Sequence, residues 1–268
     1  MCQIKFYMLP STCYDKITVE DLRVFEDNVN EIKKKDLFLI PNDYYYQRDS
    51  KNVTALEYLY ECGQNDENTY LLDIISKEKS VDIKYEMIGE QINIGYVAFP
   101  KDLLDLEKER LCVYGSKDDI VKVKRFYIMQ TKAYGEYLAW IKECFPKLVF
   151  HDNAFDSIGK LGKFFDVKEE LQRHLIVLCD YAKTIYFECN QREEEAFSVI
   201  KARYGIYCSG KGANEKEFKV DYQGGRLTCN PHTKLFTEYS SQRIYFCWGR
   251  DGIENHNIIV VKIGGHWK

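Results

Sequence analysis

The stretch from Cys229 to Lys268 reads CNPHTKLFTEYSSQRIYFCWGRDGIENHNIIVVKIGGHWK. Its second half contains the continuous β-branched run Ile258 to Val261, which is typical of a central strand buried on both faces. A second apolar run, Arg243 to Trp248, comes before it. The residues between the two runs, Gly249 to Asn257, are rich in turn formers. The stretch therefore predicts two neighbouring antiparallel strands, with the last one at the centre of a sheet.

Upstream of this stretch the pattern changes from strands to helices. Val167 to Tyr186 has apolar residues on one helical face, and Arg192 to Tyr204 predicts a second helix. Gly205 is the expected residue just past the end of that second helix. Arg226 to Cys229 predicts a further strand. We therefore expect a C-terminal domain in which two helices pack on a small, mainly antiparallel, curved sheet.

The N-terminal part predicts a mixture of helices and short strands. Gln3 to Leu9 and Asp36 to Ile40 are strand candidates, and Thr18 is the expected N-cap of the helix between them. Short β-leaning runs follow between Thr69 and Phe99. One of them, Val81 to Met87, alternates as a half-buried strand does.

These patterns together predict an α+β protein of two domains. The best boundary lies in the polar, glycine-containing segment His151 to Asp166. We assign residues 1–155 to an α+β N-terminal domain of unknown, regulatory or sensing, role, and residues 160–268 to the C-terminal domain. Residues 120–129 fit either a strand or the beginning of a helix.

Composition narrows the class of protein. The 268 residues are 45% apolar and 30% charged, which excludes a disordered tail or a fibrous repeat. The uncharged stretches are shorter than the ~20 apolar residues that span a membrane, and the first ten residues do not have the pattern of a secretory signal. We expect a cytoplasmic protein without membrane association. The ten cysteines are spread evenly without a CxxC pair, which favours ten reduced thiols.

The net charge of −4 is unevenly distributed. Residues 219–268 contain seven Lys or Arg and four acidic residues, a balance of +3, so the rest of the chain carries −7. A basic segment attached to an acidic one favours a polyanionic partner for the basic part. The acidic remainder suits the shielding of a basic segment.

Three features of the tail coincide in order: Pro231 to Leu235 (PHTKL), Arg243 to Phe246 (RIYF), and Ile263 to Lys268 (IGGHWK). With the two preceding helices, this order resembles the RelE/ParE superfamily of small toxins, over about Val167 to Lys268. The resemblance implies a RelE-like C-terminal domain and no metal or organic cofactor. Many RelE-like proteins cleave mRNA, whereas ParE-like proteins act on gyrase. The N-terminal region is additional to this family.

Metal-independent RNA cleavage needs a base for the 2′-hydroxyl, cations for the phosphorane and an acid for the leaving oxygen. Imidazole serves as acid or base at neutral pH, and Lys and Arg supply the cations. An antiparallel hairpin returns the end of the last strand to the beginning of the strand before it. The candidate catalytic residues are His232, Lys234, Arg243 and His266. The candidate substrate-binding residues are Tyr245, Arg226, Trp267 and Lys268, with Tyr245 expected to stack on a base.

We therefore expect a toxin-like effector that cleaves RNA, free or on the ribosome, in toxin–antitoxin or antiphage defence. An inhibitory or partner protein is a further possible binding partner. The alternative is a non-catalytic subunit that binds a protein or a nucleic acid. Two other motifs are weaker. Gly205 to Lys211 matches a P-loop but follows a helix and lacks the Ser or Thr after the lysine. Cys229 and His232 have loose zinc-ligand spacing, but no second close pair accompanies them.

Overall fold

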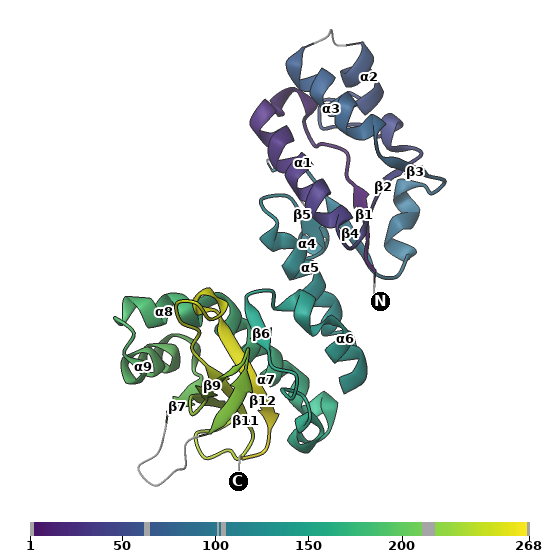
Figure 1. Cartoon of the computed structure of the whole chain (residues 1–268). Helices are drawn as coiled ribbons and strands as arrows, with labels where there is room; N and C mark the ends of the chain where they lie inside the picture. The colour runs from purple at the N-terminus through teal and green to yellow at the C-terminus, as the bar shows by residue number, and fades with distance from the viewer. Residues whose placement is uncertain (1–2, 62–64, 101, 103–105, 211–217, 267–268) are drawn as a thin grey trace. The chain divides into compact units, whose positions relative to one another are not determined.

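The structure is a computed structural model that describes residues 3–61, 65–100, 102, 106–210 and 218–266. The chain divides into two compact units, Met1–Tyr127 and Ile128–Lys268 (Figure 1). The expected boundary at residues 155–160 lies inside the second unit, because strand β6 (Leu148–Phe150) pairs there with strand β12 (Ile258–Gly264). Among the described residues, no helix is both long and apolar enough to cross a membrane.

The first unit is built on a five-stranded sheet in which every pairing is parallel. The strand order is β3-β2-β1-β4-β5, so β4 begins the second half of the sheet on the other side of β1. The strands are β1 (Lys5–Met8), β2 (Leu37–Pro41), β3 (Lys79–Val81), β4 (Ile94–Val97) and β5 (Cys112–Val113).

Helices cover this sheet. They are α1 (Val19–Lys33), α2 (Ala55–Tyr60), α3 (Asp66–Ser76), α4 (Leu106–Glu109) and α5 (Asp118–Ile128). Thr18, Thr54 and Asn65 begin α1, α2 and α3 with capping boxes. In each box the side chain of the first residue accepts from the backbone amide three residues later, and the side chain of that later residue accepts from the backbone amide of the first. The core is aromatic, and the ring of Phe25 on α1 stacks on Phe99 at 4.8 Å between centroids.

Several N-terminal predictions are confirmed and others are wrong. The expected strands near Gln3 to Leu9 and Asp36 to Ile40 and the helix that begins after Thr18 are present. The strand expected within residues 69–76 is helix α3, because Leu71, Ile74 and Ile75 have helical spacing and face the core. Residues 81–87 leave β3 and enter a 3-10 turn instead of continuing as a strand. The parallel sheet with its helices makes this unit α/β rather than α+β.

The second unit contains a five-stranded mixed sheet of order β6-β12-β11-β10-β7. Only the β6–β12 pairing is parallel among its four, so the sheet is mainly antiparallel, as expected. β12 lies between two neighbours, and Ile258 to Val261 are buried, which confirms the central strand. A bulge between Tyr245 and Phe246 interrupts the β11–β12 register and bends the strand. The remaining strands are β7 (Tyr207–Ser209), β10 (His232–Lys234) and β11 (Arg243–Cys247).

The helices of this unit are α6 (Tyr134–Cys144), α7 (Phe164–Val177), α8 (Lys183–Glu188) and α9 (Glu193–Tyr204). A π-helical segment, Leu178–Ala182, joins α7 to α8, so one helix continues from Phe164 to Glu188. Just after that segment, Lys183 donates to the backbone carbonyl of Asn255 at 2.7 Å. Both predicted C-terminal helices are therefore confirmed. Gly205 ends α9, as expected, with a φ of 66°, a left-handed conformation that favours glycine. The 3-10 turns among the described residues are Tyr14–Lys16, Tyr44–Tyr46, Tyr85–Glu90, Ile158–Leu161 and Glu254–His256.

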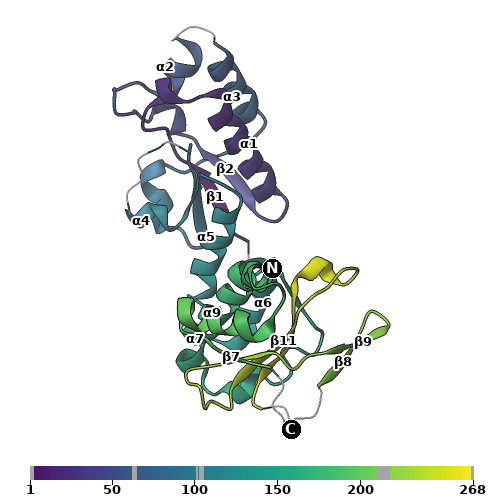
Figure 2. The same ribbon diagram turned by 90° about the vertical axis from the view of Figure 1, so that its left-hand side faces the viewer.

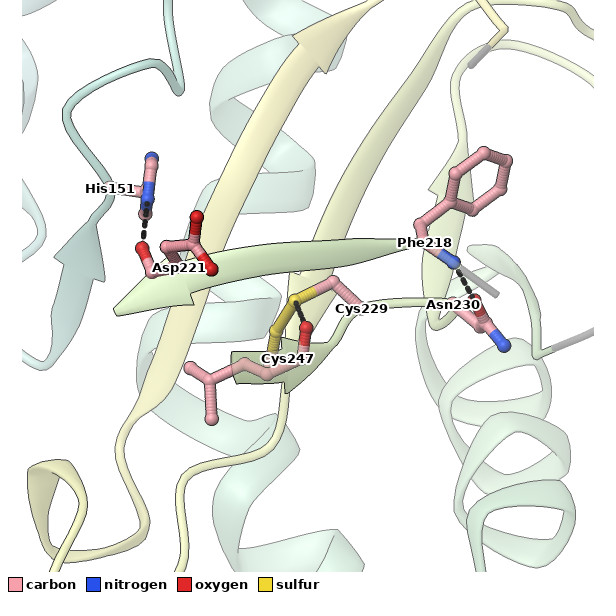
Figure 3. The surroundings of a disulfide bond; sticks show 7 residues. His151, Phe218, Asp221, Cys229, Asn230 and Cys247 are labelled. Carbon is pink, nitrogen blue, oxygen red and sulfur yellow. Dashed lines mark hydrogen bonds between the residues drawn. A yellow bond between two sulfur atoms is a disulfide. The ribbon is translucent and has the colours of Figure 1, made fainter. Parts of the chain in front are cut away.

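A separate two-stranded hairpin, β8 (Lys219–Tyr222) and β9 (Gly225–Thr228), packs on one face of this sheet (Figure 2). Leu227 on the hairpin lies in one apolar cluster with Tyr245, Ile259 and Val261 from the sheet. Figure 3 shows the anchor of this arrangement, a disulfide between Cys229 and Cys247. The prediction of ten reduced thiols is therefore wrong for these two cysteines. The chain after β9 and the end of β11 meet with their Cα atoms 4.7 Å apart, a separation that a disulfide spans.

Candidate functional site

Strands β10 and β11 bring three of the four candidate catalytic residues together. Their antiparallel register places His232 opposite Tyr245 and Lys234 opposite Arg243. Directly opposed residues and alternate residues of one strand share a face of the sheet. His232, Lys234 and Arg243 therefore lie on the same face of the sheet.

These three residues line one open cavity of about 520 Å³. Helix α9 and the edge strand β7 supply the rest of the described lining. Described lining residues from these two elements are Glu194, Phe197, Ser198 and Lys201 on α9, and Cys208, Ser209 and Gly210 at β7. The volume is within the ordinary range for a small-ligand site. We call this space the basic cavity.

The charge of the basic cavity favours an anion. Lys201, Lys234 and Arg243 contribute three positive charges among the described lining, against the single carboxylate of Glu194. Lys234 and Arg243 are directly opposed across two strands, an arrangement that destabilises a sheet when both residues carry the same charge. A bound phosphate between them would remove that repulsion. Lys201 lies 4.7 Å from the centre of the Tyr207 ring, a cation–π contact that directs it toward β7.

His232 is held in one orientation at the wall of the basic cavity. Its side chain is almost fully buried, and Nδ1 lies 2.9 Å from the backbone carbonyl oxygen of Asn230. A carbonyl oxygen only accepts, so Nδ1 carries the proton and donates. In the neutral ring the basic lone pair is then on Nε2. The ring also packs 5.0 Å from the ring of Tyr245.

Tyr245 has a different role from the one expected. Its ring is fully buried under the hairpin, 5.6 Å from Phe218, so it presents no face on which a base can stack. Its hydroxyl instead accepts a hydrogen bond from Arg243 Nη1 at 3.2 Å. Tyr245 therefore orients the guanidinium of Arg243, and the sequence could not distinguish these roles because both require the same face of β11.

The other candidates lie elsewhere or outside the described residues. His266 is exposed beyond β12, two residues after Gly264, which is opposite Arg243 in the register. Arg226 is on the hairpin, where it forms an exposed ion pair with Asp221 at 3.0 Å. Neither belongs to the described lining of the basic cavity. Trp267 and Lys268 fall outside the residues that the structure describes.

The opposite face of β10 is fixed by a buried polar chain that sequence reasoning missed. Thr233, fully buried between His232 and Lys234 in sequence, hydrogen bonds to His174 Nδ1 at 2.8 Å. His174 Nε2 lies 3.1 Å from Glu170 Oε1. The hydrogen bond to His174, with those from Arg173 and the Phe236 amide, lowers the pKa of Glu170. Burial lowers the pKa of His174. The available sequence signal was the spacing of Glu170 and His174, one helical turn apart.

The α9 side of the basic cavity was also missed, because an exposed Lys201 on a helix has no local signal. Cys208 is in the lining, but burial raises the pKa of its thiol to about 12, so it is not an activated nucleophile. Among the described residues, no group of three or more His, Cys, Asp or Glu side chains could hold a metal ion.

Comparison with known proteins adds no relative: no family model, no curated protein and no solved structure matches this chain.

Proposed function

We propose that the second unit is a RelE-like endoribonuclease that binds an RNA phosphate in the basic cavity and cleaves the strand without a metal. The observation that carries the proposal is the convergence of His232, Lys234 and Arg243, from separate parts of the chain, on one cavity with Lys201. Helices packed on a mainly antiparallel sheet agree with the expectation from the toxin resemblance. A role in toxin–antitoxin or antiphage defence, with the first unit as the controlling part, belongs to the same proposal.

In this mechanism His232 Nε2 takes the proton of the ribose 2′-hydroxyl, because Nδ1 is already committed to the Asn230 carbonyl. The 2′-oxygen attacks phosphorus and the bond to the 5′-oxygen breaks. Arg243 and Lys234 stabilise the extra negative charge of the phosphorane. The leaving 5′-oxygen takes a proton from the ammonium of Lys201 or Lys234. The products are a 2′,3′-cyclic phosphate and a 5′-hydroxyl, so no external reactant is consumed.

One observation favours a second candidate, RNA binding without cleavage. His232 has only 2% of its surface exposed, so a 2′-hydroxyl reaches it only by entering the cavity. A phosphate needs no such entry to meet the cations at the rim. This candidate retains the basic cavity as the site and removes only the step that His232 performs.

The test is cleavage of end-labelled RNA by the full chain in the presence of EDTA. We expect fragments that end in a 2′,3′-cyclic phosphate and no cleavage of DNA. The variant His232→Asn retains a donor for the Asn230 carbonyl but lacks the base. We expect it to lose about 100-fold or more in rate while RNA affinity changes less than about 3-fold. The double variant Lys234→Ala, Arg243→Ala loses binding and cleavage together.

Arg226→Ala is the matched control, because it removes an exposed cation outside the cavity. Cleavage by His232→Asn at the wild-type rate would overturn the catalytic assignment. Salt-dependent RNA binding that needs Lys234 and Arg243, without cleavage by the wild type, would establish the second candidate. No binding and no cleavage would reject both.

A further inference from the structure

The parallel sheet of the first unit has a topological switch point between β1 and β4. From β1 the chain proceeds through β2 to β3 on one side, and then returns to place β4 on the other side. In open parallel sheets, the loops at the carboxyl ends of the two strands beside such a point diverge and leave a crevice, where ligands bind. The switch point therefore identifies one edge of this sheet before any side chain is considered.

Two adjoining cavities lie at that edge. The larger measures about 620 Å³ and the smaller about 120 Å³, and both are lined by Lys16 and Ile17. The lining comes from the segment after β1, the segment after β2 and, through Phe99 and Asp102, the segment after β4. We call the two cavities together the switch-point cleft.

Half-buried carboxylates hold the walls of the switch-point cleft in place. Asp102 accepts hydrogen bonds from the Thr12 amide at 2.7 Å and the Phe99 amide at 3.2 Å, and so ties the segment after β4 to the one after β1. Asp49 accepts from the Tyr14 amide at 3.2 Å and the Val53 amide at 2.9 Å. These carboxylates are already solvated by backbone amides. They are part of a preformed wall and do not carry uncompensated charge.

The charges that remain available are of opposite sign. Lys51 is paired with Asp15, and Asp21 is occupied by the capping box of α1. Lys16 and Glu67 line the larger cavity, and their side chains have no hydrogen bond or ion pair with any described residue. The cleft therefore offers one cation and one hydrogen-bond-accepting carboxylate to a ligand.

The wall also contains aromatic rings. Tyr14 and Tyr58 stack at 5.2 Å between centroids and both line the larger cavity. The Tyr14 hydroxyl is buried and has no partner of normal hydrogen-bond geometry among the described residues. Tyr14 and Tyr58 are 0% and 5% exposed, so they form a rigid wall and present no face on which a base can stack. A ligand for this cleft thus needs an anionic group for Lys16 and hydroxyl donors for Glu67. A ribonucleoside monophosphate has both, and carboxylates bind ribose hydroxyls in parallel-sheet nucleotide sites.

We propose that the switch-point cleft binds a ribonucleotide, with the phosphate on Lys16 and the ribose hydroxyls on Glu67. A volume of about 620 Å³ accommodates such a ligand. The site is separate from the basic cavity and does not depend on the proposed nuclease function. A sensing role of the first unit would then have ribonucleotides as its ligands.

The test is calorimetric titration of the full chain with AMP, GMP, CMP and UMP. Adenosine serves as the probe without phosphate, and 2′-deoxy-AMP as the probe without the 2′-hydroxyl. We expect at least one monophosphate to bind with a Kd below about 1 mM. Lys16→Ala should weaken it about 10-fold and remove the advantage of the nucleotide over its nucleoside. Glu67→Gln should remove the preference for ribose over deoxyribose.

Two controls separate this site from the basic cavity and from general charge effects. Lys35→Ala removes an exposed lysine outside the cleft and should leave the Kd unchanged. The double variant Lys234→Ala, Arg243→Ala should also leave it unchanged. Loss of nucleotide binding in that double variant, no binding of any monophosphate at 10 mM (about ten times the expected limit), or equal binding by Lys16→Ala and wild type would overturn the proposal.

Discussion

The two sheets of this protein position polar side chains in different ways. In the parallel sheet of the first unit, the polar groups stand on loops beyond the strand ends, as Ser11 and Asp102 do. In the mixed sheet of the second unit they stand on the strands themselves, in register, as Lys234 and Arg243 do. A site made by loops can change without disturbing the sheet, whereas a site made by register is tied to the pairing that folds the unit.

The two units are also stabilised differently. Capping boxes begin three helices of the first unit. A disulfide and a buried polar chain hold the strands of the second unit that carry the basic cavity. A substitution in a capping box should therefore destabilise only the first unit, and one in the disulfide or the buried polar chain only the second. Hydrogen exchange, read separately over the two units, is the measurement that distinguishes them.

The largest effect on stability is expected from the disulfide. It closes a loop with a sequence separation of 18, so its loss should cost about 3 kcal/mol of unfolding free energy through the larger entropy of the unfolded chain. The double variant Cys229→Ser, Cys247→Ser should show faster exchange in β9 to β12 and unchanged exchange in β1 to β5. Cys13→Ser, a free thiol of the first unit, is the control. Equal destabilisation of both units would break the comparison.

The buried polar chain comes next. Thr233→Val retains the shape of the side chain but removes the partner of His174 Nδ1. An unsatisfied buried polar group costs about 1–3 kcal/mol, and we expect urea unfolding to show a loss of this size. Thr237→Val, at an exposed position four residues further along the chain, should change stability little. If the two variants behave alike, the chain does not anchor β10.

The same chain predicts a pH dependence. Burial lowers the pKa of His174, so the unfolded chain takes up a proton that the folded chain resists. The stability of the second unit should therefore fall as the pH decreases from about 7 to 5. Below about pH 5 the stability should fall further, because the lowered pKa of Glu170 means that the unfolded chain binds a proton on this carboxylate before the folded chain does. His174→Gln removes the imidazole titration and should flatten the dependence between pH 7 and 5 in thermal unfolding. An equally steep dependence in that variant would assign it to other groups.

The smallest effect is expected in the first unit. Thr18→Ala removes the capping box of α1 and should cost about 1 kcal/mol. Faster exchange confined to the first turns of α1 is the expected result. Thr69→Ala, at an exposed site inside α3, is the control and should be neutral or slightly stabilising. A response in the second unit to Thr18→Ala would contradict the separation of the two units.

The sequence predicts those elements of the fold that are determined by residues close together in the chain. The β-branched run at Ile258 and the apolar run after Arg243 are local patterns, so these two strands are predictable from the sequence. The apolar run at Leu71 favours a strand by its residue types, but it forms a helix, for which Asn65 supplies the cap. The partners of these elements are not local. Nothing near Phe150 indicates pairing with β12, and nothing near Cys229 specifies Cys247.

The site residues divide in the same way. His232, Lys234 and Arg243 are candidates because of the ordered tail segments that contain them, and the strand register then brings them together. Lys201 belongs to the same cavity only because α9 packs beside β7, which is a tertiary contact. The switch-point cleft was missed altogether, since Ser11 and Asp102 meet across 91 positions of sequence.

The π-helical segment Leu178–Ala182 sets the phase of the helix that contains it. A π-helical turn contains one residue more than an α-helical turn, because its hydrogen bonds join residues i and i+5. Removal of one residue from this segment would therefore convert it to α-helix and leave the residues before and after it in phase. Ile185, now 1% exposed, would stay in the interior, and Lys183 would stay beside the carbonyl of Asn255. A one-residue deletion should therefore be better tolerated here than within α7, where it would rotate everything downstream by about 100°.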